Sequence, residues 1–149
     1  MSGRPALLQP GAELADALAR LHHRAFAGQS RAWEAAEFAA LLETAPCFAV
    51  GEPRAFALGR VIADEAELLT LATDPEARRQ GLARACLAAF ETEAHDRGAT
   101  HAFLEVAEIN DAALALYLAA GYQPSARRTG YYRLEDGGRA DALILTKAL

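Results

Sequence analysis

The chain has 149 residues, of which 52% are hydrophobic and 23% are charged, and its formal net charge is −5. This length is typical of one domain with a substantial buried core, and the composition argues against intrinsic disorder. The acidic balance disfavours a nucleic-acid-binding surface, and the longest uncharged apolar stretch, 112–122, is far shorter than the roughly 20 residues that a membrane span needs.

The first half of the chain predicts two helices followed by strands. The helices follow from apolar residues at helical spacing, and the strands from short apolar segments that turn-like residues bound. The predicted elements are a short strand near 6–8, helices over 12–27 and 32–43, and strands over 47–50, 55–62 and 67–73.

The second half of the chain alternates helices and strands. The predicted elements are a helix over 81–97, a strand over 100–106, a helix from 110 or 111 to 120, and strands over 122–128 and 142–147. Gly98 and Gly121 follow the two helices, where a left-handed residue commonly ends a helix. A loop that contains Gly130, Gly137 and Gly138 is expected between the last two strands. The whole order predicts a central sheet with packed helices, an α+β fold.

The cysteines and histidines do not form a metal-binding or redox motif. Cys47 and Cys86 are the only cysteines, and without a Cys-x-x-Cys pair or a secretory signal we expect a cytoplasmic protein. Cys86 falls in the apolar arc of the predicted helix 81–97 and is expected in the core. His22 and His23 are adjacent and diverge on a helix, so no metal site is predicted.

The segment Arg78-Arg79-Gln80-Gly81-Leu82-Ala83 lies between a predicted strand and a predicted helix. A glycine lets the backbone approach a ligand closely, and a helix start presents unpaired N–H groups and the positive end of a dipole. With Arg84 nearby, the segment predicts a cradle for a pyrophosphate. A solvated basic turn that merely begins a helix explains this segment alone equally well.

Further motifs accompany this turn over nearly the whole chain. They are Leu71–Pro75, Leu104–Val106 with Asn110, Ala115–Tyr117 with Gly121-Tyr122, Arg127–Tyr132 followed by Asp141–Ile144, and the aromatic pair Phe26 and Trp33. Together with Arg78-x-x-Gly81-x-Ala83, they resemble the GNAT superfamily of N-acetyltransferases and, within it, the RimI-like ribosomal-protein-alanine N-acetyltransferases. We therefore expect a single domain over residues 1–149.

The resemblance implies a fold and a set of cofactor contacts. It implies an α/β/α layered fold, with a mixed central sheet in which two parallel strands, 67–73 and 100–106 here, splay apart and hold acetyl-CoA between them. The backbone of the first strand would pair with the pantetheine arm, and the turn after it would enclose the pyrophosphate. The residues that would bind the cofactor are Leu71, Ala72, Thr73, Arg79, Gln80, Gly81, Leu82, Ala83, Arg84 and Asn110.

Acetyl transfer needs a neutral amine and a proton for the leaving thiolate. A protein α-amine, with a pKa of about 7.7–8.0, is partly neutral near neutral pH, whereas a lysine near about 10.4 is almost wholly charged. The resemblance matches Glu105 to the general base and Tyr117 to the general acid of RimI-like proteins. The alternatives are an edge carboxylate paired with an arginine for Glu105, and a packed helix tyrosine with its hydroxyl at the surface for Tyr117.

Aromatic and acidic side chains near the C-terminus suggest an acceptor site. Tyr131 and Tyr132 are expected to form an aromatic wall around a peptide. The acidic residues in this region are Glu108, Glu135, Asp136 and Asp141. They would suit a positively charged N-terminal segment, although a solvated acidic surface explains them equally well. The run 107–110 departs from the Arg-x-Ser-Asn that usually follows Leu-Glu-Val in RimI-like proteins, and Ala83 replaces the commoner glycine.

These observations predict an acetyl-CoA-dependent N-acetyltransferase. Transfer would be direct, in a ternary complex, to a protein N-terminal α-amine, and the resemblance implies a small-subunit ribosomal protein as the acceptor. The alternatives are an acetyltransferase for a small-molecule amine or lysine, and a non-catalytic acyl-CoA-binding protein. No nucleic acid, membrane or metal is expected as a partner.

Overall fold

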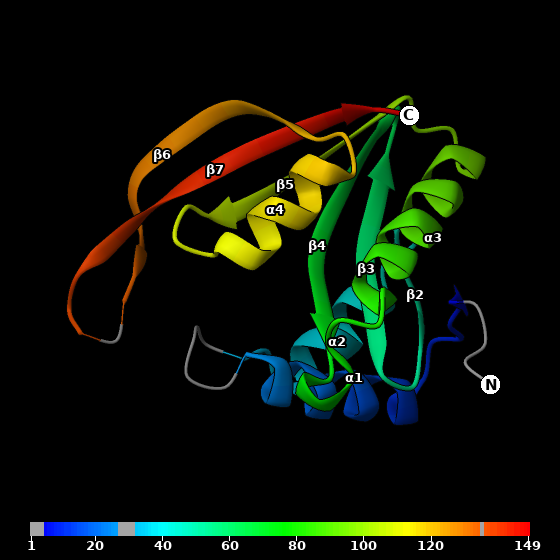
Figure 1. Ribbon diagram of the computed structural model, residues 1–149. Helices are drawn as coiled ribbons and strands as arrows, with labels where there is room; N and C mark the ends of the chain where they lie inside the picture. The colour runs from blue at the N-terminus through cyan, green and yellow to red at the C-terminus, as the bar shows by residue number, and fades with distance from the viewer. Residues whose placement is uncertain (1–4, 27–31, 135) are drawn as a thin grey trace.

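The computed structural model describes residues 5–26, 32–134 and 136–149. Figure 1 shows a curved sheet with helices on both of its faces. In chain order the elements are β1 (Ala6–Leu7), α1 (Ala12–Ala25), α2 (Ala35–Leu42), β2 (Cys47–Glu52), β3 (Ala55–Ile62), β4 (Glu65–Thr73), η1 (Pro75–Ala77), α3 (Leu82–Asp96), β5 (His101–Ala107), α4 (Asp111–Ala119), β6 (Gln123–Arg133) and β7 (Arg139–Ala148). None of the helices in these ranges has the length and apolarity that crossing a bilayer requires.

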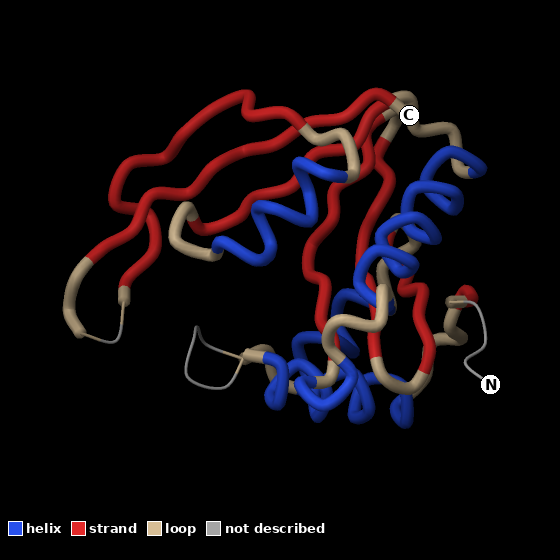
Figure 2. Tube along the Cα trace, viewed as in Figure 1, coloured by secondary structure: helices blue, strands red, loops and turns tan. Residues whose placement is uncertain are grey.

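The predicted α+β class and the predicted order of elements are confirmed (Figure 2). The second helix begins later than predicted, at Ala35, where the Glu37 carboxylate accepts the N–H of Glu34 at 3.1 Å and fixes the first turn. The predicted end of the first helix, Ala27, lies outside the described residues. The loop predicted between the last two strands is confirmed at Gly137 and Gly138, but it is wrong at Gly130, which lies inside β6, a longer strand than expected.

Seven of the described strands form one sheet in the order β1-β2-β3-β4-β5-β7-β6. Neighbouring strands are antiparallel except β4 and β5, which run parallel. The parallel register extends only from Glu65 opposite His101 to Leu68 opposite Leu104. Beyond Leu68 the two strands separate, as Figure 1 shows. The predicted pair of splayed strands is therefore confirmed.

An extra residue in β4 marks the point where the strands separate. Gly59 of β3 pairs with Leu68, whereas Leu58 pairs with Thr70, so Leu69 has no partner in the register of the described strands. A β-bulge of this kind bends its strand and increases the local twist. It turns the end of β4 away from β5, while β3 supports β4 as far as Thr73.

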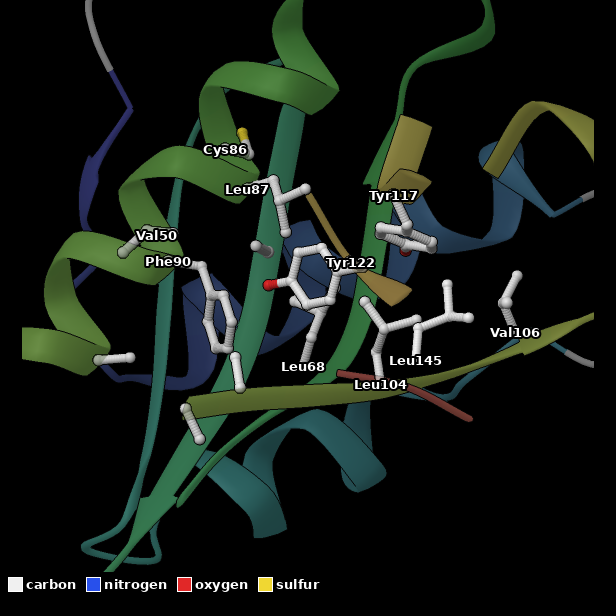
Figure 3. Close-up of a cluster of buried hydrophobic side chains, with 14 of the residues drawn as sticks. Val50, Leu68, Cys86, Leu87, Phe90, Leu104, Val106, Tyr117, Tyr122 and Leu145 are labelled. Carbon is white, nitrogen blue, oxygen red and sulfur yellow. The ribbon is translucent and has the colours of Figure 1, made fainter. Parts of the chain in front are cut away.

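Apolar side chains alternate between the two faces of the sheet, and each face buries its own core. On one face α3 and α4 cover a core that includes Leu68, Phe90 and Leu104 (Figure 3). On the other face α1 and α2 cover a core that includes Phe38 and Phe56. Because side chains two apart in a strand share a face, slipping the register by one residue would send the apolar side chains of each core to the opposite face of the sheet.

Gly59→Ala should destabilise the protein by about 1–3 kcal/mol, because a Cβ at this position would overlap the ring of Phe90 in α3. Urea unfolding measures the loss, and it should be smaller in a Phe90→Leu background, where less of the ring remains to collide. Equal stability of Gly59→Ala and the unchanged protein would contradict the packing of α3 on β3.

Candidate active site

Two adjoining cavities open where β4 and β5 separate. The larger, of about 970 Å³, is lined by residues of α1, β4, β5, the start of α4 and β6. The smaller, of about 470 Å³, is lined by the end of β4, the turn before α3, and α4. Phe26, Leu71, Asn110 and Tyr117 line both cavities, so the two volumes meet at these side chains. A paired cleft of this kind can hold two ligands in contact.

The turn before α3 presents backbone N–H groups to the smaller cavity. Arg79 and Gly81 adopt left-handed conformations, with φ of 65° and 77°. The first hydrogen bond of α3 runs from the Ala85 N–H to the Gly81 carbonyl at 3.0 Å, so the preceding N–H groups have no helical acceptor. Among the described residues, no side chain caps this helix start. Free N–H groups in a concave turn, at the positive end of a helix, favour a bound anion.

The predicted cofactor-binding residues gather around the smaller cavity, with one exception. Those that line it are Leu71, Ala72, Thr73, Arg79, Gly81, Leu82, Ala83, Arg84 and Asn110. The exception is Gln80, whose Oε1 accepts a hydrogen bond from Arg54 at 3.1 Å and is thereby held against the β2–β3 turn. Arg78 donates to the carbonyl of Ala25 at 3.0 Å, which ties this turn to the end of α1.

The end of β4 exposes a backbone edge to the cleft. Residues 71–73 pair with β3 on one side, whereas the parallel register with β5 has already ended at Leu68. The peptide groups that point toward β5 therefore face the cavity rather than another strand. An extended ligand with amide groups can pair with this edge as an added strand.

Helix α4 places two predicted residues where the cavities meet. Asn110 caps the helix, because its Oδ1 accepts the N–H of Ala113 at 3.2 Å. Tyr117 is only 8% exposed, so its side chain is packed in the core, with its ring 6.0 Å from that of Tyr122 (Figure 3). Burial, followed by the nearby Tyr132, raises the pKa of Tyr117 well above its usual range. Tyr117 therefore keeps its proton at neutral pH.

The surroundings of Glu105 in β5 have features of both roles expected for it, a general base and a carboxylate paired with an arginine. Its carboxylate lines the larger cavity and accepts a long hydrogen bond from the Tyr132 hydroxyl, at 3.4 Å. The Arg128 Nε lies 3.6 Å from its other oxygen, but the Arg128 side chain is 58% exposed. An ion pair with so exposed an arginine is weak in water. Glu105 therefore remains available to a molecule that enters the cavity.

Tyr131 and Tyr132 lie in β6 rather than in the predicted loop. Their rings meet edge to face at 5.3 Å, and both line the larger cavity. Gly130, with a φ of 62°, lies where the pairing of β6 with β7 is irregular, and its N–H donates to Asp141 at 2.8 Å. This bond keeps the irregular segment within the strand, which explains why Gly130 lies in β6 and not in the predicted loop.

The acidic residues predicted near the acceptor site divide into two groups. Glu108 and Asp141 both bind Arg127, at 2.9 and 2.6 Å, so they form a clamp rather than a free acidic surface. The Gly130 N–H, and then Arg127, hold the pKa of Asp141 below its usual range. Asp136 lines the larger cavity, and Glu135 lies outside the described residues.

Several residues that the sequence analysis left out of the site also line the larger cavity. Two of them are His22, considered there only as a metal ligand, and Thr70, which neighbours the predicted platform. The spacing of His22 and Phe26, four residues apart on a helix that packs on the sheet, signals that they share a face. Thr70 carried no comparable signal, because its direction depends on the bulge at Leu69. In the described ranges no group of three or more His, Cys, Asp or Glu side chains could hold a metal ion.

Comparisons of the sequence with known proteins show the family of this chain and its named relatives. The model of the acetyltransferase (GNAT) family matches residues 13–122. The [ribosomal protein bS18]-alanine N-acetyltransferase of Escherichia coli K12 is 43% identical over 95 residues, which are 64% of each chain. The enzyme of the same name from Haemophilus ducreyi is 37% identical over 91 residues, or 61% of this chain and 63% of the relative. The chain thus spans under two thirds of the length of these curated relatives.

Comparisons of structures extend over more of the chain. The crystal structure of the ribosomal-protein-S18-alanine N-acetyltransferase from Escherichia coli has a TM-score of 0.85 and 32% identity, over 97% of this chain and 93% of that one. Arabidopsis thaliana NAA60 in complex with acetyl-CoA has a TM-score of 0.79 over 97% and 98% of the two chains, at 15% identity, and shows likeness of fold alone. The chain belongs to the acetyltransferase (GNAT) family.

Alkaline pH should weaken the fold through Tyr132. Burial, and then the charge of Glu105, raises the pKa of Tyr132 to about 12. A phenol whose pKa is higher in the folded than in the unfolded chain stabilises the fold below about pH 10, and this contribution is lost as the pH rises further. The free energy of unfolding should fall with rising pH above this point, and less steeply in Tyr132→Phe. Urea unfolding at a series of pH values measures both slopes, and equal slopes would contradict the half-buried phenol.

Proposed function

We propose that this protein is an N-acetyltransferase that moves an acetyl group from acetyl-CoA to the N-terminal α-amine of a protein. The observation that carries the proposal is the pair of cavities that meet at Tyr117, one beside an anion cradle and the other containing Glu105. The relatives' names support an acceptor that begins with alanine, such as a small-subunit ribosomal protein. Such an acceptor implies a reaction in the cytoplasm.

The smaller cavity fits acetyl-CoA by the chemistry of its lining. The backbone edge at 71–73 suits the amide groups of a pantetheine arm, and the N–H groups at the start of α3 suit a pyrophosphate. Arg79 and Arg84 add positive charge beside this turn. These features would place the thioester at the junction, next to Leu71 and Tyr117, which line both cavities.

The larger cavity would take the acceptor amine and support direct transfer. Glu105 accepts a proton from the α-amine, whose pKa of about 7.7–8.0 needs only a weak base. A bond forms between the amine nitrogen and the acetyl carbon, and the carbon–sulfur bond breaks. Tyr117 supplies the proton that the departing sulfur takes up, and solvent restores both groups.

Release of free CoA, detected with a thiol reagent, tests this function. The acceptor panel contains peptides that begin with Ala, Ser or Met, an N-blocked peptide, a peptide whose only amine is a lysine, and spermidine. We expect turnover with unblocked Ala or Ser starts. Turnover confined to lysine or spermidine would move the function to another acetyltransferase class, and acetyl-CoA binding without any turnover would favour a binding protein.

Glu105→Gln and Tyr117→Phe should each lower kcat by about a hundredfold or more, the usual contribution of a positioned acid or base. Both replacements keep the shape of the side chain, so the affinity for acetyl-CoA, measured by calorimetry, should stay within about twofold of the unchanged protein. Unaltered kcat in either variant would contradict the role assigned to that residue.

Gly81→Ala should weaken acetyl-CoA binding, because an alanine disfavours the left-handed backbone that shapes the anion cradle. Gly98→Ala is the matched control: Gly98 also has a positive φ and free space around its Cβ position, but it follows the opposite end of α3. Both variants should lose about 1 kcal/mol of stability. Only Gly81→Ala should raise the Kd for acetyl-CoA, and a matching rise in Gly98→Ala would contradict the cradle.

A further inference from the structure

A polar pair on the wall of the larger cavity, a buried histidine and a half-buried threonine, has no part in the transfer described above. His22 of α1 is 2% exposed, and its Nε2 lies 3.1 Å from the Oγ1 of Thr70 in β4. Both residues line the larger cavity, in which Glu105 also lies. The pair therefore belongs to the wall that an acceptor would touch.

The imidazole of His22 is held in one orientation. Its ring stacks on Phe26 at 4.2 Å and on Trp33 at 5.4 Å, and it meets the edge of Phe38 at 5.6 Å. Its Nδ1 accepts the backbone N–H of Trp33 at 3.2 Å. Rotation of the ring away from Thr70 would break this bond and the stacking together.

The direction of the bond to Thr70 follows from the partner of Nδ1. A backbone N–H can only donate, so Nδ1 carries no proton, and the proton of the neutral ring is on Nε2. Nε2 therefore donates, and the Oγ1 of Thr70 accepts. The Thr70 hydroxyl keeps its own hydrogen, and within the described part of the chain its one hydrogen bond is the one to His22.

The bulge at Leu69 brings Thr70 to this wall. Side chains two apart in a regular strand share a face, so without the extra residue Thr70 would point the same way as Leu68, into the core under α3. The bulge reverses the alternation, and Thr70 faces α1 instead, on the side where Ala72 is buried.

We infer that the Thr70 hydroxyl determines acceptor specificity by donating a hydrogen bond to the first backbone carbonyl of the acceptor, with His22 as the residue that orients it. This inference rests on the proposed function. In a protein N-terminus that carbonyl is attached to the carbon that bears the reacting amine. In a lysine side chain or a polyamine the corresponding group is a methylene, which accepts no hydrogen bond. A site built around such a donor selects against substrates that lack the acceptor.

The test compares two peptides with a free N-terminal alanine, one of them with its first carbonyl replaced by a methylene. The unchanged protein should prefer the normal peptide by about tenfold or more in kcat/KM. Thr70→Val keeps the shape of the side chain and removes the hydroxyl. It should lower kcat/KM for the normal peptide by this factor of about ten and leave kcat/KM for the methylene analogue unchanged. Thr70→Ser should restore the preference, and His22→Phe, which keeps an aromatic ring, should reduce it.

Thermal unfolding and the Kd for acetyl-CoA, measured for every variant, show whether the fold and the cofactor site are intact. An equal loss on both peptides in Thr70→Val would overturn the inference, because it would reveal a merely structural role. Full activity of Thr70→Val on the normal peptide would overturn it too. Failure of the unchanged protein to acetylate the normal peptide would instead overturn the proposed function, and this inference with it.

Discussion

The separation of β4 from β5 is the constraint on which the rest of the site depends. Parallel strands normally stay paired along their length, but here one extra residue, Leu69, bends β4 just after the last pair, Leu68 and Leu104. Backbone groups that would have bonded to β5 face a cavity instead. The same bend places the turn before α3 on one side of the gap and Glu105 on the other. The bulge at Leu69 thus leaves the backbone edge of β4 open and creates the two cavities that meet at Tyr117.

Two of the acidic residues near the cleft are held in an ion-pair clamp. Arg127 joins Glu108 and Asp141, which fastens the loop after β5 to the β6–β7 hairpin and offsets part of the negative charge of the two carboxylates. This clamp holds the hairpin beside β5, where the Tyr132 hydroxyl reaches Glu105. Burial keeps the proton on Tyr117. The carboxylate of Glu105 and the protonated phenol of Tyr117 therefore line the same cavity.

The sequence alone predicts much of the fold and the parts of the site that lie in recognisable motifs. Glycine positions, apolar periodicity and the motif at Gly81 give the order of elements and the cradle, and the resemblance points to Glu105 and Tyr117. The bulge at Leu69 could not be predicted, because the residue at the bulge is an ordinary leucine. The direction of Thr70 follows from that bulge and was missed with it. The pairing of Glu108 with an arginine on β6 depends on strand register, which local patterns do not reveal.

The most direct test is the affinity of a bisubstrate compound in which CoA is joined, through an acetyl linker, to the N-terminal amine of an Ala-start peptide. If the two cavities meet at Tyr117 and hold both substrates at once, the compound should bind at least about a hundredfold more tightly than CoA, since the second contact becomes intramolecular. Isothermal titration calorimetry measures both affinities. An affinity no better than that of CoA would show that the acceptor does not occupy the larger cavity and would contradict direct transfer at this site.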